Sequence, residues 1–230
     1  MRAALAVLIW LCAAMVQAGA WPRSEGEAFV SLSADQNQAQ IYGEYGIGGD
    51  WTLGMEATMS AARTVPDVIG FLQHPIWREA AGGILSGGLA FGTRDAARQD
   101  ALYNGSGLVG VLAEQEVVLR GGLFWGRGFE TRWGNGWTTI EAQAESVWDV
   151  ASGLGRGAMK LDATVGIRPT ERLMLMAQAQ TYQRDGSAVL LRLEPSAGWS
   201  LGRSTLVLSP SVGVSGPTDP RFKLGVWLDF

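Results

Sequence analysis

The stretch that decides the fold is Pro220–Phe230, with the sequence PRFKLGVWLDF. Apolar residues occupy every second position of this stretch, and the last of them is Phe230. The positions between them hold Lys223, Gly225, Trp227 and Asp229. Because side chains of an extended strand alternate between two faces, the stretch predicts a strand with one wholly apolar face and one mixed, charged face.

The same alternation recurs along the chain, for example in Trp51–Ser60 and Gly157–Arg168. In Asp67–Pro75 a strand is predicted, but the pattern does not resolve its two faces. The predicted strands are Gly26–Ala34, Ala39–Ile47, Trp51–Ser60, Asp67–Pro75, Gly82–Thr93, Glu116–Phe129, Trp137–Asp149, Gly157–Arg168, Leu173–Gln180, Val189–Ser196, Leu206–Ser215 and Pro220–Phe230. The pattern therefore predicts an all-β fold of about twelve antiparallel, up-and-down strands, an even number as in single-chain bacterial barrels.

The composition narrows the class of protein. With a net charge of -4, the chain offers little to neutralise a phosphate backbone, which argues against a nucleic-acid partner. Beyond the N-terminus there is no apolar run long enough for a membrane-spanning helix, whereas barrel strands need only about 9–11 residues. A single His and a single Cys argue against a transition-metal site and against any other cofactor bound through such ligands.

The N-terminus has the pattern of a signal peptide that directs export through the Sec pathway. Arg2 supplies a positive charge, Ala3–Val16 is apolar, and Ala18-Gly19-Ala20 is a small-residue cleavage site. We therefore predict a signal peptide over residues 1–20 and a single barrel domain over residues 21–230. Cys12 lies in the predicted signal peptide, so the mature chain would contain no cysteine.

The connections between strands also fit a barrel. Short turns follow the even-numbered predicted strands, and the first of them is Gly48-Gly49-Asp50. The longest break, between Thr93 and Gln115, follows an odd-numbered strand and would therefore lie on the outer side, where long loops belong. Aromatic residues near strand ends are candidates for the two interfacial girdles: Trp51, Trp125, Trp137, Trp148, Trp199 and Phe230.

Alternation alone does not say which face points outward. A soluble sandwich or lipocalin-type barrel would turn the apolar face inward and the charged face to water. The terminal aromatic strand, the repeated hairpins and the N-terminal leader, however, together resemble small Gram-negative outer-membrane β-barrel proteins. The resemblance implies a porin-like barrel surrounded by outer-membrane lipid and lipopolysaccharide. It also implies that the barrel-assembly machinery recognises the strand that ends at Phe230.

If the apolar faces meet lipid, the charged residues between them face the lumen. Acidic side chains of the second, third and seventh strands would then lie partly across from basic side chains of later strands, and such a field orients dipolar solutes. Local ion pairs, such as Glu145 with Lys160 or Arg192 with Glu194, are the alternative. The lumen-facing candidates are Glu44, Glu56, Glu141, Glu145, Lys160, Asp162, Arg172, Arg192, Glu194 and Lys223.

Three functions remain open. The first is a narrow channel or transport-related protein for small polar or amphipathic solutes. The second is a closed structural or surface-interaction barrel whose long loop contacts a partner. The third is a membrane-embedded hydrolase, which would need His74, the only histidine, to activate a serine. No catalytic motif supports the third, and we expect a protein that is not an enzyme.

Overall fold

The computed structural model describes residues 19–61, 65–95, 115–150 and 152–230. These residues form a closed antiparallel barrel of twelve strands, which confirms the predicted fold. No helix in these ranges is long and apolar enough to cross a membrane. The strands are β1 (Ala28–Ala34), β2 (Gln38–Gly48), β3 (Trp51–Ser60), β4 (Asp67–Arg78), β5 (Gly83–Asp95), β6 (Gln115–Thr131), β7 (Gly134–Asp149), β8 (Gly155–Arg168), β9 (Leu173–Arg184), β10 (Leu190–Leu201), β11 (Ser204–Ser215) and β12 (Arg221–Asp229).

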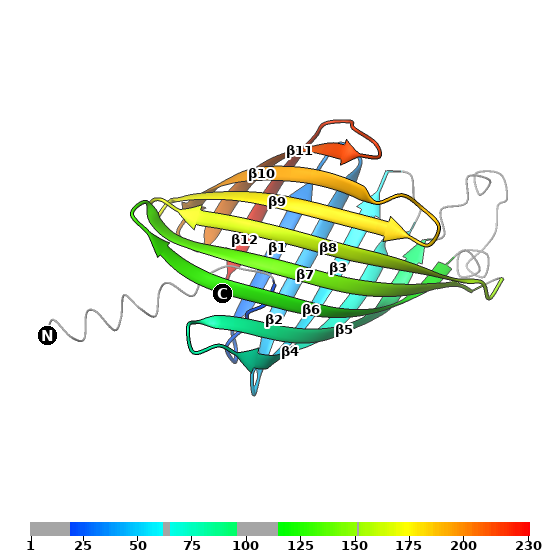
Figure 1. Cartoon of the computed structure of the whole chain (residues 1–230), viewed down its shortest axis with the longest axis horizontal. Helices are drawn as coiled ribbons and strands as arrows, with labels where there is room; N and C mark the ends of the chain where they lie inside the picture. Colours follow the sequence, from blue (N-terminus) through cyan, green and yellow to red (C-terminus); the bar gives the residue numbers. More distant parts are fainter. Residues whose placement is uncertain (1–18, 62–64, 96–114, 151) are drawn as a thin grey trace, which may run out of the picture.

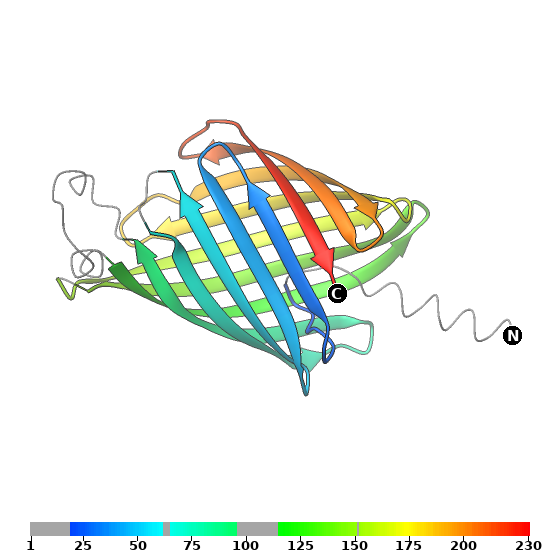
Figure 2. The same cartoon turned by 180° about the vertical axis from the view of Figure 1, so that it is seen from behind.

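Each strand pairs with its neighbours in the chain, and β1 closes the barrel against β12 (Figures 1 and 2). The seam runs from the Phe29–Asp229 pair to the Ala34–Leu224 pair. Beyond it, the backbone N–H of Ala28 donates to Phe230 and the N–H of Phe230 donates back to Ala28. Closure removes the unpaired strand edges that would otherwise leave backbone groups without partners in lipid.

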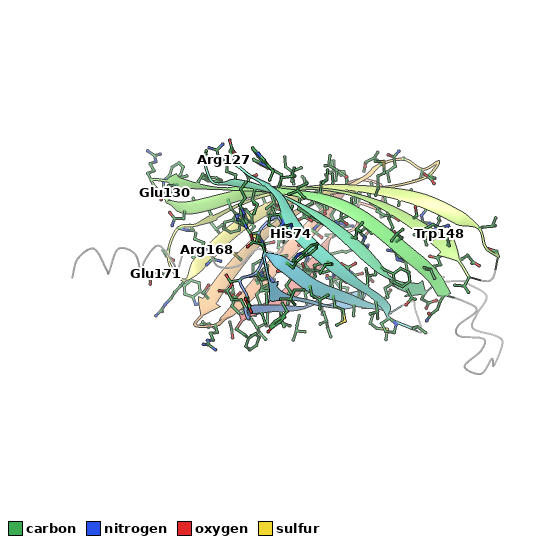
Figure 3. All side chains as sticks on the ribbon, turned by 90° about the horizontal axis from the view of Figure 1, so that it is seen from below. His74, Arg127, Glu130, Trp148, Arg168 and Glu171 are labelled. Carbon is green, nitrogen blue, oxygen red and sulfur yellow. The ribbon has the colours of Figure 1, made fainter. Side chains whose placement is uncertain are left out.

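The turns after even-numbered strands share one end of the barrel with Phe230, and we call this the terminal end. The predicted turn Gly48-Gly49-Asp50 lies there, and all three residues have positive φ angles. Arg127, Glu130 and Glu171 mark the same end in Figure 3, while Trp148 lies at the opposite, far end. The predicted long loop after Thr93 falls between β5 and β6, and its residues 96–114 lie outside the described ranges.

The apolar face of the strands points outward. On β12, the side chains of Phe222 and Leu224 are more than half exposed, whereas Gly225, the next residue after Leu224, is buried. Large apolar side chains on the other strands, such as Leu89 and Met159, are exposed in the same way. A closed barrel with an apolar belt of this kind is stable only when lipid covers the belt, so the membrane orientation predicted above is the right one.

Two features of the interior differ from the expected pattern. In β4, Ile69 and Phe71 point inward and pack with Ala90, Val118 and Val147. Both faces of β4 are therefore apolar, which explains why alternation could not resolve them.

Trp137 was predicted to belong to an interfacial girdle, and this prediction is wrong. Its side chain is 6% exposed and packs inside the lumen with Met174 and Val207. Trp137 lies two residues before Thr139 and four residues before Glu141. Because side chains alternate along a strand, all three point to the same, inward face of β7. Trp51, Trp148, Trp199 and Phe230 are exposed at strand ends, as an interfacial girdle requires.

Candidate functional site

A network of ion pairs fills the lumen beside strands β3 to β7. Glu145 accepts hydrogen bonds from Arg94 at 2.8 and 3.1 Å and from Arg120 at 3.1 and 3.2 Å. Arg120 also binds Glu56 at 2.9 Å, and Arg94 lies 3.5 Å from Asp67. The Arg120–Glu56 pair joins β6 to β3 over the intervening β4 and β5. Long side chains therefore cover the apolar cluster of Ile69 and Val118 instead of leaving it open.

Other charged groups of the lumen pair more locally. Lys160 lies 2.8 Å from Asp162 on β8, and Lys223 of β12 lies 2.5 Å from Glu194 of β10. Arg156 pairs with Glu116 near the far end. Pairs of this local kind are the alternative to a field across the lumen that the sequence left open.

The N-terminal segment Gly19–Arg23 occupies the lumen at the terminal end. The carbonyl oxygen of Gly19 accepts a hydrogen bond from Gln73, and that of Ala20 accepts one from Ser86, both at 2.5 Å. Arg23 binds Glu44 at 2.6 Å, and its N–H donates to Thr52. The segment is thus held to several strands and crosses the interior where β1 begins.

Trp21 of this segment joins a layer of large side chains that closes the terminal end. Its partners are Trp137, Met174, Val207 and Trp227, and we call the layer the tryptophan floor. Gly126 of β6 makes room for it, because a Cβ at Gly126 would stand 2.6 Å from the Trp21 ring. A glycine is therefore required there for the segment to lie against the wall.

Three adjacent cavities lie in the lumen. The far chamber, of about 250 Å³, is bounded by Arg94 and Glu145 near the far end. The middle chamber, of about 160 Å³, shares Glu56 and Arg120 with it. The tryptophan chamber, of about 210 Å³, lies on the tryptophan floor and shares Glu141 with the middle chamber. The shared lining residues show that the three cavities are neighbours, with the middle chamber between the other two.

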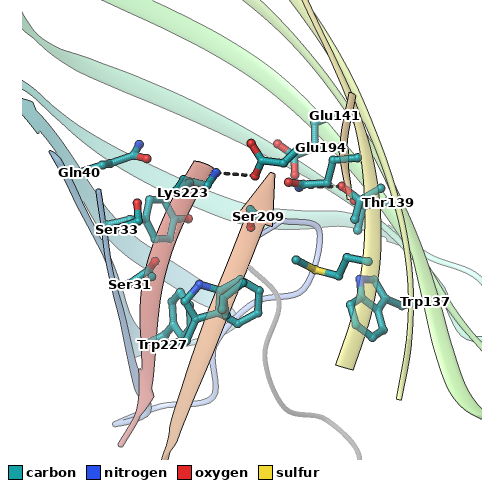
Figure 4. A pocket seen from close by; sticks show the side chains of 17 residues that line it. Ser31, Ser33, Gln40, Trp137, Thr139, Glu141, Glu194, Ser209, Lys223 and Trp227 are labelled. Atoms are coloured by element: carbon teal, nitrogen blue, oxygen red, sulfur yellow. Dashed lines mark hydrogen bonds and ion pairs between the residues drawn. The ribbon is translucent and has the colours of Figure 1, made fainter. Parts of the chain in front are cut away.

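The tryptophan chamber combines apolar and polar walls (Figure 4). Trp137 and Trp227 lie at its floor, and the Lys223–Glu194 pair lies above them. Ser31, Ser33 and Gln40 approach from β1 and β2, while Thr139 and Glu141 approach from β7 on the other side. The chamber therefore offers hydroxyl, amide and carboxylate groups above an aromatic base.

The structure places the predicted lumen residues as follows. Six of them line the cavities: Glu56, Glu141, Glu145, Lys160, Glu194 and Lys223. Glu44 is buried beside Arg23, Asp162 pairs with Lys160, and Arg192 donates to Ser211. Arg172 does not reach the interior, because it lies exposed in the turn between β8 and β9. The strand predicted to start at Leu173 does start there, so Arg172 belongs to the turn.

The sequence interpretation missed the partners of the acidic residues. Glu145 is bound by Arg94 and Arg120 rather than by Lys160, and Glu194 is bound by Lys223 rather than by Arg192. Arg120 has the same parity as Val118 and Gly122 in a strand with few polar residues, so alternation alone could have placed it inward. Arg23 precedes β1 and gave no such signal.

His74 and Phe230 lie away from these cavities. The His74 ring packs against Trp51 on the outer face of the barrel, with ring centroids 4.5 Å apart (Figure 3). This is an interfacial position and not a site beside a lumen serine. Phe230 is 62% exposed at the seam, and its recognition by the assembly machinery stays a prediction.

Within the described ranges, no group of three or more His, Cys, Asp or Glu side chains is arranged to hold a metal ion. The polar groups of the lumen are instead ion pairs, hydroxyls and amides. They can bind a solute through hydrogen bonds and charge, and they can exclude solutes by size.

Comparisons with known proteins identify the kind of barrel. No family model and no curated protein matches the sequence. Among solved structures, the chain is similar to a KdgM porin in complex with disordered oligogalacturonate, at a TM-score of 0.59 and 8% identity, over 89% of this chain and 99% of that one. It is also similar to the NanC porin, at a TM-score of 0.58 and 10% identity, over 88% of this chain and 100% of that one. The fold is that of an outer-membrane β-barrel.

A further likeness extends over the full chain. The translocator domain of the autotransporter NalP from Neisseria meningitidis matches at a TM-score of 0.53 and 11% identity, over 100% of this chain and 95% of that one. Porins and a translocator domain thus share the barrel fold of this chain. The exposed apolar belt and this common fold place the protein in the outer membrane, surrounded by its lipids.

Proposed function

We propose that this outer-membrane barrel is a narrow channel, or a component of transport, for small polar or amphipathic solutes. The observation that carries the proposal is the presence of three neighbouring cavities in the lumen, which share lining residues such as Glu56 and Glu141. A barrel with a purely structural role would be more stable if packed side chains filled this space. The similarity to porins of the same architecture supports the same function.

In this proposal Trp21–Arg23, the part of the N-terminal segment that follows the predicted cleavage site, controls the width of the channel at the terminal end. Trp21 completes the tryptophan floor, and Arg23 fastens the segment to Glu44. Solutes would pass only when this segment shifts or leaves gaps beside it. The channel would therefore conduct weakly in its resting arrangement.

Planar-bilayer recordings of the folded protein test this function. We expect a small single-channel conductance, which Glu56→Ala alters because Glu56 lines both the far and the middle chamber. The double substitution Trp21→Ala with Arg23→Ala should raise the conductance several-fold by loosening the segment. Trp199→Ala is the matched control, because Trp199 is exposed on the outside of the barrel, and it should leave the conductance unchanged.

A well-folded double variant that carries no current would contradict the channel. That result would favour the closed structural barrel instead, a function that one observation also supports. The ion-pair network around Glu145 and the Trp21–Arg23 segment, which packs on the tryptophan floor and binds Glu44, already fill much of the interior.

A further inference from the structure

The tryptophan chamber contains polar groups that the protein itself does not satisfy. Ser31, Ser33, Gln40 and Glu141 line it and make no hydrogen bond or ion pair with any other residue that the structure describes. These side chains are partly exposed to the cavity, so their polar atoms are free to bind water or a polar ligand that enters it. These four side chains come from β1, β2 and β7 and approach the cavity from two sides (Figure 4).

The floor of the same chamber is apolar and aromatic. Trp137 and Trp227 present indole rings, and Met176 and Val207 lie beside them. Aromatic rings provide large, rigid apolar surfaces, while the groups above them provide directional hydrogen bonds. A ligand that fits both must have an apolar face and several hydroxyl or amino groups around its edge.

The size of the chamber limits the ligand to one ring. Its volume of about 210 Å³ lies below the roughly 300–1,000 Å³ of pockets for drug-sized ligands. A six-membered polyhydroxy ring matches this size, and its axial C–H groups give it the required apolar face. A longer oligomer would have to extend into the middle chamber, where Arg120 and Lys160 narrow the space.

Charge then selects among such rings. The charged residues that line the chamber are Glu141, Glu194 and Lys223, and Lys223 is neutralised by Glu194 at 2.5 Å. Lys160 is the cation that acts most strongly on Glu141, but its ammonium group is paired with Asp162. The carboxyl group of Glu141 therefore has no hydrogen bond or ion pair of its own in the described part of the chain.

We propose that the tryptophan chamber binds a single sugar-sized polyhydroxy ring, and that Glu141 makes it prefer an amino sugar to an acidic one. The proposal rests on the channel function, because it names the class of solute that the lumen holds. Ser31, Ser33 and Gln40 bind ring hydroxyls, the indoles of Trp137 and Trp227 contact the ring face, and the carboxylate of Glu141 binds the ammonium group.

Equilibrium binding to the full-length, folded protein in detergent micelles tests this site without any measurement of current. The probes are glucosamine, glucose and glucuronate, which share one ring and differ in charge. Saturation-transfer NMR detects their binding and titration gives the dissociation constants. Wild type should bind glucosamine about fivefold more tightly than glucose, a factor expected for one charge pair in a partly hydrated site, and glucuronate most weakly.

Glu141→Gln should bring the three dissociation constants together, because it removes the carboxyl group that distinguishes them. Glu130→Gln, in an exposed turn at the terminal end, is the control and should preserve the order. Absence of saturation transfer to all three sugars, or glucuronate binding as tightly as glucosamine in wild type, would overturn the proposal. If the sugars bind while the bilayer recordings stay silent, the site stands and only the channel function fails.

Discussion

The lumen has two walls of different character. The wall from β3 to β7 carries the ion-pair network of Asp67, Arg94, Glu145, Arg120 and Glu56 over an apolar cluster. The wall from β9 through β12 to β1 is built mainly from hydroxyl and amide side chains. They include Gln178, Gln180, Ser196, Ser209, Ser211, Ser31 and Ser33.

The difference changes what each wall offers to the cavities beside it. Arginine and glutamate side chains are long enough to reach across two strands, so the far and middle chambers are bordered by paired charges such as Arg120 and Glu56. Serine side chains are short and uncharged, so the tryptophan chamber is bordered on that side by hydroxyl groups.

The largest expected effect comes from breaking the network wall at its centre. Glu145→Gln removes the carboxylate that binds both Arg94 and Arg120. Because each arginine keeps one acidic partner, we expect a loss of about 3 kcal/mol in unfolding free energy, the low end for a broken buried pair. Urea unfolding in detergent, followed by tryptophan fluorescence, measures it.

The control for this substitution is Glu194→Gln on the hydroxyl wall. Glu194 is as buried as Glu145 but has one partner, the half-accessible Lys223. Its loss should be about 1 kcal/mol, close to that of a surface pair. Equal losses for the two variants would mean that the walls do not differ in the way their contacts indicate.

A smaller effect is expected where the N-terminal segment meets the network wall. Gly126→Val places a side chain where the Trp21 ring now lies, at 2.6 Å from the added Cβ. We expect displacement of the segment, a loss of about 1–3 kcal/mol from overpacking, and a raised bilayer conductance.

Gly121→Val on the same strand is the matched comparison. An added Cβ at Gly121 meets only Leu89, at 3.8 Å, on the outer face. It should leave both stability and conductance near the wild-type values. If Gly126→Val behaves in the same way, the segment does not occupy the lumen of the folded protein.

The smallest expected effect concerns the hydroxyl wall itself. Ser209→Ala removes the acceptor of the 2.7 Å hydrogen bond from Ser196, at a position that is 2% exposed. The expected loss is about 1 kcal/mol, the usual value for one buried hydrogen bond. Ser33→Ala, which removes no hydrogen bond within the described part of the chain, should be neutral. A larger loss for Ser33→Ala, by the same unfolding assay, would contradict the assignment of Ser33 as a group without a partner.

Much of the fold was predictable because alternation has a fixed period. A strand in a membrane barrel must present every second residue to lipid. The face on which a residue such as Leu224 or Lys223 lies therefore follows directly from its position in the alternating pattern. The number of strands, the closing position of Pro220–Phe230 and the even-strand turns all followed from this rule. It gave no answer for β4, where Ile69 and Phe71 make the inner face apolar as well.

The candidate site was less predictable, because pairing depends on distance and not on parity. Parity could indicate that Glu145 points inward, but it could not select Arg94 and Arg120 over Lys160 as its partners. The placement of Trp137 shows the opposite case. Alternation with Thr139 and Glu141 would have placed the Trp137 side chain inward, whereas the preference of tryptophan for membrane interfaces led to the wrong prediction.

The sequence by itself determined that the chain forms about twelve strands, each with one apolar and one polar or charged face, since these properties depend only on local alternation. That the apolar face points outward was implied by the resemblance to outer-membrane barrels and is shown by the exposed side chains of the closed barrel. The tertiary structure alone decided which charges neutralise one another, where cavities remain, and that Gly19–Arg23 enters the lumen. These are decided by how far side chains reach across a curved wall, and residues from β3, β6 and β7 meet only after the sheet has closed.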